Sequence, residues 1–211
     1  MTRDELTQRI LTALNDSPTD PVFWSLEEIH DIIAEGQELL AEEVAALRQT
    51  VYVPWRTGAL FYSLGSLAGD CMAITRIWRP DTHERLEATT LTALGPTPWM
   101  EQPGTTQRVW FTVSWHCFGV HPHPTTGQGS FEVDYLAWPP ALLDDADEPA
   151  CPEPDQEALV TYGVYAGLLK QWDWGRAHDL WQQFVARWSD AQARSGSRQL
   201  QARAWQRSAR R

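Results

Sequence analysis

One short stretch of the sequence carries side chains that could bind a metal ion. Three histidines and a cysteine lie within the eight residues His116–His123, and imidazole nitrogens and thiolates are preferred zinc ligands. Their spacing matches no zinc finger, and the remaining cysteines, Cys71 and Cys151, lie far away in the sequence. An odd number of widely spaced cysteines also provides no disulfide framework. We therefore favour a proline-rich loop with incidental histidines, and the sequence predicts no metal and no other cofactor.

No other stretch places a nucleophile beside a general base. Gly65 precedes Ser66, but the G-x-S-x-G pattern of a nucleophile elbow does not surround it. Residues 127–129 read Gly-Gln-Gly, without the Lys-Ser/Thr pair that completes a phosphate-binding loop. The carboxylates occur in a run, which is typical of a solvated surface rather than of an acid–base pair. The sequence therefore favours a protein that is not an enzyme.

The elements that would position any site begin with two predicted helices. Thr2 with Glu5 forms a capping box for a short helix over residues 2–15, and Ser25 with Glu28 forms a second capping box. Gly36 interrupts the second helix at a cost of about 1 kcal/mol relative to alanine. This glycine indicates either the close approach of another backbone or a tolerated defect. The helical period continues to about residue 48 through Leu26, Ile29, Ile32, Ile33, Leu39, Leu40, Val44 and Leu47.

The middle of the chain has the alternating, β-branched patterns of strands. Residues 89–106 and 119–129 are expected to be long loops, the first of them rich in proline and glycine. In the strand that follows residue 107, we expect Val109, Phe111 and Val113 on one face. The predicted strands cover residues 50–54, 59–64, 71–78, 84–88, 108–115 and 131–138.

The last third of the chain returns to helical patterns. Residues 141–153 form an acidic connection that is expected to be solvated. Pro154 suits the first turn of a helix that ends near Gln171. Asp173 can cap a final helix, which Ser195-Gly196-Ser197 is expected to stop.

This order of elements predicts an α+β fold. Helices at both ends of the chain, residues 1–49 and 154–194, are expected to pack as a bundle. A central, mainly antiparallel β-sheet, residues 50–140, is expected as an insertion between them. Residues 1–194 are predicted to form a single domain, followed by an extended basic C-terminal arm over residues 195–211.

Charge is segregated along the chain. Residues 195–211 contain five arginines and no acid, whereas residues 1–194 contain twelve Lys and Arg against 28 Asp and Glu. An acidic body with a basic end is typical of a protein that docks into a partner. Leu200 and Trp205 provide apolar anchors that purely electrostatic binding would not need. The twelve tryptophans also indicate contacts between chains, where this residue is enriched.

The sequence shows no membrane or export signal. No apolar stretch approaches the roughly 18 residues that span a bilayer, and residues 1–5 do not read as the start of a signal peptide. We therefore expect an intracellular protein, or one packaged into a soluble assembly, that does not bind a membrane.

Residues 23–64 resemble the start of the head-to-tail adaptor (connector) proteins of tailed bacteriophages. A later segment is also similar, with Pro139-Pro140, an acidic turn and the helical sequence PEPDQEALVTYGVYAGLLKQWD following one another. The resemblance covers about residues 5–190 and depends on the joint order of its features. These features include Trp24-Ser25, Glu35-Gly36-Gln37, Val51-Tyr52-Val53, Tyr62-Ser63-Leu64 and Val133-Asp134-Tyr135.

The resemblance implies a non-catalytic structural protein of the virion, located at the head–tail junction after assembly in the host cytoplasm. Its copies are expected to form a ring, usually a dodecamer, beneath the portal protein. The ring would continue the DNA channel used in DNA ejection and give the tail or tail-stopper protein a landing surface. Double-stranded DNA would pass through without sequence-specific binding.

The resemblance also implies two sets of contact residues. The loops 89–106 and 119–129 are expected to face the tail or the next subunit. The helix that packs between neighbouring subunits would contribute Trp24, Ile29, Ile33, Gly36 and Leu40. The portal-docking arm would consist of Arg198, Leu200, Arg203, Trp205, Arg207, Arg210 and Arg211.

Several interpretations stay open from the sequence. The acidic body serves either solubility or a channel wall that repels DNA phosphates. The protein could instead be another tail-completion or tail-tube-proximal structural protein. A small metal-dependent hydrolase that uses His116–His123 is the least favoured alternative, and zinc that is retained after dialysis would support it.

Overall fold

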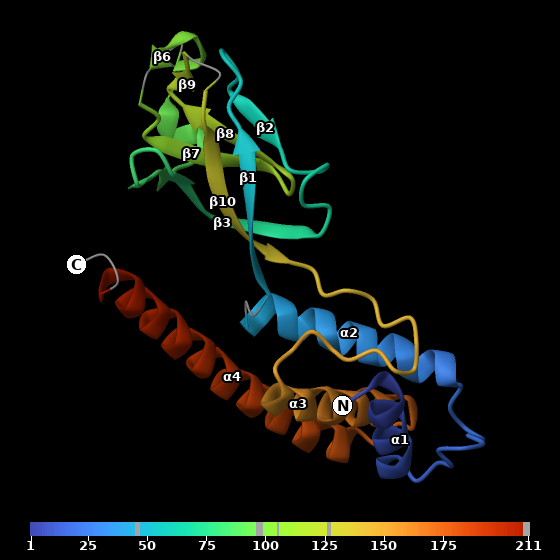
Figure 1. The fold of residues 1–211 in the computed structure, drawn as a ribbon. Helices are drawn as coiled ribbons and strands as arrows, with labels where there is room; N and C mark the ends of the chain where they lie inside the picture. The colour runs from blue at the N-terminus through green and yellow to red at the C-terminus, as the bar shows by residue number, and fades with distance from the viewer. Residues whose placement is uncertain (45–46, 96–98, 105, 126–127, 209–211) are drawn as a thin grey trace. The chain divides into compact units, whose positions relative to one another are not determined.

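The computed structural model describes residues 1–44, 47–95, 99–104, 106–125 and 128–208, and residues 43–44 and 194–208 as backbone only. It divides into two compact units (Figure 1). The helical unit combines the two ends of the chain, residues 1–47 and 139–211, and the β unit is the continuous segment 48–138. The fold class is therefore α+β, as the sequence predicts. The single-domain assignment for residues 1–194 stays a prediction.

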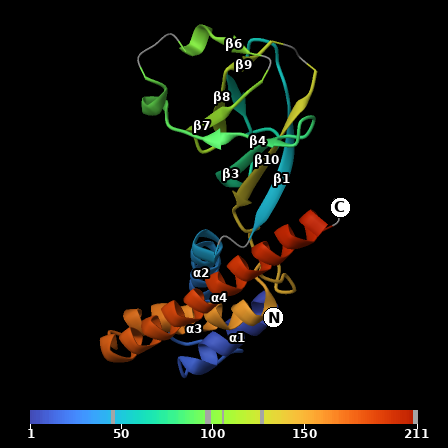
Figure 2. The same ribbon diagram turned by 90° about the vertical axis from the view of Figure 1, so that its left-hand side faces the viewer.

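The helical unit contains α1 (Arg3–Ala13), α2 (Leu26–Val44), α3 (Glu153–Lys170) and α4 (Trp174–Ser208). Helix α3 contacts each of the other three helices (Figures 1 and 2). The two predicted capping boxes are confirmed: Thr2 and Glu5 bond reciprocally at the start of α1, and Ser25 and Glu28 do so before α2. Leu6, Ile10, Ile29, Leu159 and Phe184 are among the apolar residues of one shared core.

The β unit contains two four-stranded sheets and a short pair of strands. The first sheet has the order β1 (Arg48–Pro54), β10 (Ser130–Ala137), β3 (Cys71–Arg79), β4 (Glu84–Arg85). The second has the order β2 (Phe61–Ser63), β8 (Cys117–His121), β7 (Val109–Ser114), β5 (Glu87–Ala88). Strands β6 (Pro103–Gly104) and β9 (His123–Pro124) form the pair, and two short 3₁₀ helices span Leu91–Leu94 and Trp99–Glu101.

Aromatic rings fill the interior of the β unit. The ring of Phe131 lies 5.5 Å from Trp55, 5.3 Å from Tyr62 and 6.1 Å from Phe118 between centroids. Such edge-on and tilted contacts stabilise beyond the area that they bury. Most strand pairs are antiparallel, but β5 with β7 and β6 with β9 are parallel.

The structure corrects three details of the predicted strands. Residues 84–88 form two short strands that belong to different sheets, because β4 pairs with β3 whereas β5 pairs with β7. Part of the predicted loop 119–129 is strand β8, which lies between β2 and β7. The expected alternation in β7 is also wrong, since Trp110 and Phe111 are both buried and Val113 is exposed. Burial in β7 is therefore not decided by a simple inside–outside alternation.

The predicted end of the last helix is also wrong. Helix α4 does not stop at Ser195-Gly196-Ser197 but continues to Ser208, so the arm is not extended over residues 195–208. Extending an existing helix adds one hydrogen bond for each residue that is fixed. The following Arg, Gln, Ala and Leu residues are strong helix formers, which offsets the roughly 1 kcal/mol cost of Gly196.

Candidate interaction surfaces

The residues predicted to pack between subunits lie inside the helical unit. Trp24, Ile29, Ile33 and Leu40 are all in its core with at most 3% of their surface exposed. Gly36 is buried against α3, and a Cβ atom there would approach Tyr162 Cδ1 to 2.8 Å. The glycine thus permits close approach of a side chain of the same chain. These five residues offer little surface to a neighbour, and the predicted contact of this helix with another subunit stays a prediction.

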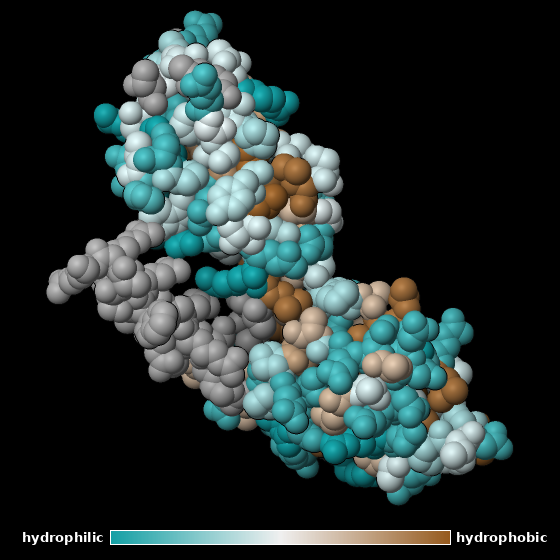
Figure 3. Space-filling view, viewed as in Figure 1, coloured by the Kyte–Doolittle hydropathy of each residue, from teal (hydrophilic) through white to brown (hydrophobic). Residues whose placement is uncertain are grey.

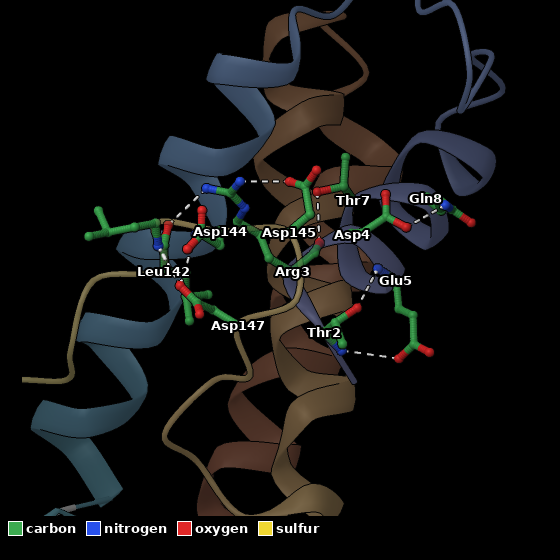
Figure 4. A network of polar contacts seen from close by, with 11 residues as sticks. Thr2, Arg3, Asp4, Glu5, Thr7, Gln8, Leu142, Asp144, Asp145 and Asp147 are labelled. Atoms are coloured by element: carbon green, nitrogen blue, oxygen red, sulfur yellow. Dashed lines mark hydrogen bonds and ion pairs between the residues drawn. The ribbon is translucent and has the colours of Figure 1, made fainter.

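The acidic connection is bound to the start of α1 rather than fully solvated (Figure 4). The Arg3 guanidinium donates to the Leu142 carbonyl oxygen at 2.9 Å and to Asp145 Oδ1 at 2.6 Å. The backbone amides of Arg3 and Asp4 donate to the carbonyl oxygens of Asp147 and Asp145. The first amides of a helix have no partner within the helix, so the connection satisfies two of them.

The carboxylate of Asp147 folds the connection back on itself. It accepts the backbone amides of Leu143 at 2.8 Å and Asp144 at 2.9 Å. These bonds, led by that of Asp144, lower the pKa of Asp147 because they stabilise its charged form. The connection therefore has a defined conformation on one side of the helical unit.

A single carboxylate fixes the loop between α1 and α2. Asp16 accepts the backbone amides of Val22 and Phe23 at 3.0 Å each and that of Trp24 at 3.1 Å, as well as that of Ser17. These amides, led by Val22, lower the pKa of Asp16. The side chain of Trp24 is buried, whereas those of Val22 and Phe23 are exposed. The loop therefore holds two apolar side chains outward on a fixed backbone.

Lys170, the last residue of α3, connects the end of that helix to this loop and to the start of α2. Its ammonium group lies 4.3 Å from the centroid of the Trp24 ring and 5.2 Å from that of Phe23. It also donates to Glu28 Oε1 at 2.6 Å. The hydrogen bond from Lys170 is the largest cause that lowers the pKa of Glu28 to about 2.

The turn after α3 places a tryptophan where helices favour glycine. The Trp172 amide donates to the Leu169 carbonyl and the Asp173 amide to the Leu168 carbonyl, both at 3.1 Å. This is the Schellman pattern, whose left-handed residue is usually glycine and sometimes asparagine. Helix α1 ends in the same way with Asn15 at φ 59°, but here Trp172 adopts φ 62°.

The turn between α3 and α4, together with the loop before α2 and its first residue, presents a surface that we call the aromatic end. Trp172 is 77% exposed and Trp174 is 59% exposed, and their rings lie 5.8 Å apart. Apolar side chains interrupt the mostly hydrophilic surface of the helical unit in Figure 3. The sequence did not indicate this surface, because helical periodicity does not show which tryptophans remain outside a core. The aromatic end consists of Val22, Phe23, Leu26, Trp172 and Trp174.

The structure places the histidine-rich stretch mainly in strands. Residues 117–121 form β8, in which side chains alternate between the two faces of the sheet, so Cys117 and His121 share one face. Partial burial is the main cause that lowers the pKa of His121. Among the residues that the structure describes, no group of three His, Cys, Asp or Glu side chains could hold a metal ion. The described geometry therefore brings no metal site together at His116–His123.

The predicted arm residues fall into two groups. The first group belongs to helix α4 and consists of Arg198, Leu200, Arg203, Trp205 and Arg207. The second group, Arg210 and Arg211, lies outside the described residues. The last α4 residue with a described buried side chain is Ala191. No helix within the described parts of the chain has an apolar stretch long enough to cross a bilayer.

Comparison with known proteins identifies the family. No curated protein matches the chain. The family model described as SU10 adaptor protein matches residues 1–211, which is the entire sequence. This match confirms the resemblance to the head-to-tail adaptors of tailed bacteriophages and indicates a structural component of the virion that interacts with other head or tail proteins. The chain therefore belongs to the SU10 adaptor protein family.

Proposed function

We propose that copies of this protein form a ring that connects the portal of a phage capsid to the tail and continues the DNA channel. The family match over the whole chain supports an adaptor role. The expected ring is a dodecamer beneath the portal protein at the head–tail junction. Its other partner is the tail or a tail-stopper protein, toward which the segments 89–106 and 119–129 would face.

The observation that carries this proposal is the length of α4 relative to its packing partner. Helix α4 has 35 residues and α3 has 18, which correspond to about 50 Å and about 27 Å at 1.5 Å per residue. In this proposal, the half of α4 that exceeds the length of α3 reaches another protein. That half carries the cationic end of an otherwise acidic chain.

In this proposal the C-terminal half of α4 is the portal-docking arm. Arg198, Arg203 and Arg207 would face acidic groups of the portal protein, together with Arg210 and Arg211 beyond the described residues. Leu200 and Trp205 would supply the apolar anchors that dominate binding energy at many interfaces. A helical arm loses less conformational entropy on docking than an extended one would.

The acidic body would act as a channel wall. DNA phosphates are repelled by carboxylates, so a wall with excess negative charge does not retain passing DNA. Residues 1–194 carry this excess, and much of it is exposed, as at Asp20, Glu27 and Asp31. Double-stranded DNA would then move through without sequence-specific contacts.

Deletion of residues 196–211 tests the arm. We expect the shortened chain to keep its thermal unfolding midpoint, because the described core of the helical unit extends only to Ala191. We expect its binding to purified portal protein to weaken by at least about tenfold, as for the loss of an interface hot spot. Binding is measured by co-purification and by titration, and electron microscopy of the chain with and without portal shows whether rings form.

A matched variant separates the anchors from the charge. The double substitution L200A/W205A keeps all five arginines, and it should weaken portal binding without changing the net charge. A truncated chain that still binds portal normally would show that another surface makes this contact.

A further inference from the structure

The aromatic end is an exposed apolar surface that has no role in the proposed docking of the arm. Trp172 adopts a left-handed conformation at φ 62°, which is unfavourable for bulky residues. Its own chain does not compensate by burying the ring, because Trp172 is 77% exposed. Glycine would serve the turn better, so the tryptophan contributes something other than the stability of this helix end.

The aromatic end is held in place before any partner binds. The carboxylate of Asp16 fixes the backbone that presents Val22 and Phe23. On the other side of the surface, the Schellman bonds fix the backbone at Trp172. Lys170 joins the two parts through its contacts with Phe23 and Glu28. Contact groups that are already ordered lose little entropy on association.

The apolar area is large enough for a specific interface. An aromatic side chain carries about 150–250 Å², so the exposed fractions of Trp172 and Trp174 amount to roughly 300 Å². Val22, which is 90% exposed, and Phe23 and Leu26 add to this. The total is comparable to the largest apolar patch of a typical monomer, about 300–600 Å² and often functional, and would form the apolar centre of a standard interface, in which each partner buries roughly 800 Å².

The same helical unit carries a groove of about 430 Å³ that could receive such a surface. Its apolar lining comes from α1, α3 and α4, through Ala13, Val160, Val164 and Leu180. Arg176 and Asp179 also line it, and Arg176 is 60% exposed and forms a 3.6 Å ion pair with Asp173.

We propose that the aromatic end of one copy docks into the α1–α3–α4 groove of the next copy. In this arrangement each copy presents its aromatic end to one neighbour and its groove to the other, so the contact is heterologous, and repeating a heterologous contact generates a ring when the rotation closes. The inference rests on the proposed ring and names the surfaces that join its subunits. Trp172 and Trp174 are the anchors, and the groove is the pocket that they fill.

Two single substitutions test this contact from its two sides. W172G removes an anchor and places glycine at the left-handed position, so the unfolding midpoint should stay or rise while self-association weakens by about tenfold or more. A13R fills the groove from an exposed position at the end of α1 and should weaken self-association equally. Sedimentation velocity over a concentration series measures the association, and thermal unfolding measures the fold.

Two matched controls keep the fold and the surface chemistry comparable. N15G places glycine at the equivalent left-handed position of α1, at φ 59°, without removing an aromatic ring. L143A removes another strongly exposed apolar side chain of the helical unit, 77% exposed, that lies outside the aromatic end. Both should associate like the wild-type chain.

Mixing the two variants gives the sharpest result. W172G keeps an intact groove and A13R keeps an intact aromatic end, so the pair should form one-to-one complexes that cannot grow into rings. Normal rings from both variants would overturn the contact and leave the proposed ring standing. Rings that persist in W172G while portal binding is lost would assign the aromatic end to the portal instead. A wild-type chain that remains monomeric, alone and with portal, would overturn the ring itself.

Discussion

At the scale of single residues, Lys170 connects chain segments that are far apart in the sequence. It contacts the Trp24 and Phe23 rings and pairs with Glu28, which also caps α2. Exposed ion pairs contribute little by themselves. The main effect of this cluster is therefore on position: it holds the end of α3 against the loop that carries Val22 and Phe23.

The ion pair predicts a specific pH dependence. The pKa of Glu28 is about 2 in the folded chain, below its ordinary value of 4.5. The unfolded state therefore binds the proton more readily, and the stabilisation is complete above pH 4.5 and is lost as the pH falls toward 2. In E28Q this loss is not possible, so its unfolding midpoint should fall less than that of wild type between pH 5 and pH 2.5.

Chemical denaturation at a series of pH values measures this difference. E27Q is the matched control, because it removes a carboxylate from the same helical turn and leaves the Lys170–Glu28 pair in place. Parallel acid profiles for the wild-type chain and E28Q would contradict the assigned role of Glu28.

At the scale of elements, the length of α4 matters most for function. A strong turn signal at Ser195-Gly196-Ser197 does not interrupt this helix. The reason is that the residues on both sides are good helix formers, and a helix that has already started extends readily. The arm is thus a continuation of a core helix, so in the proposed docking its direction at the portal would be set by the packing of α4 against α3.

The substitution G196A tests the continuous helix. If residues 194–208 are helical, alanine should stabilise that segment by about 1 kcal/mol relative to glycine. Hydrogen exchange of the amides after residue 197 should then slow, and the far-ultraviolet circular dichroism should show more helix. Unchanged, fast exchange throughout this segment would favour the extended arm that the turn signal predicts.

At the scale of the whole molecule, charge is divided between an acidic body and a cationic end. The two parts would have different consequences, because a large like-signed surface repels DNA over long range, whereas the proposed arm would bind its partner locally. Interactions between exposed charges weaken as salt shortens the screening length from about 10 Å at 0.1 M to about 3 Å at 1 M. Docking and folding should therefore respond differently to salt.

Raising the salt concentration from 0.1 M to 0.5 M should weaken portal binding several-fold and change the unfolding midpoint of the chain much less. Titration with portal protein and thermal unfolding under the same conditions provide the comparison. A variant in which the five C-terminal arginines are replaced by glutamine should bind weakly with little salt dependence. Equal salt dependence of that variant and the wild-type chain would exclude the arginines as the source.

The sequence by itself determined what depends on neighbouring residues. Capping boxes at Thr2 and Ser25 act over three residues, and both appear in the structure. Most of the predicted strands were recognised from local alternation, and the order of motifs identified the adaptor family. The segregation of charge is also a property of the sequence alone.

Only the tertiary structure decided features that depend on distant contacts. Arg3 meets Asp145 across the fold, and β8 becomes a strand because β2 and β7 lie on either side of it. Gly36 proved to face Tyr162 within the same chain. Sequence periodicity shows that a side chain is apolar but not whether a neighbour covers it, so the exposure of Trp172 and the groove beside Leu180 emerged only once the helices were packed.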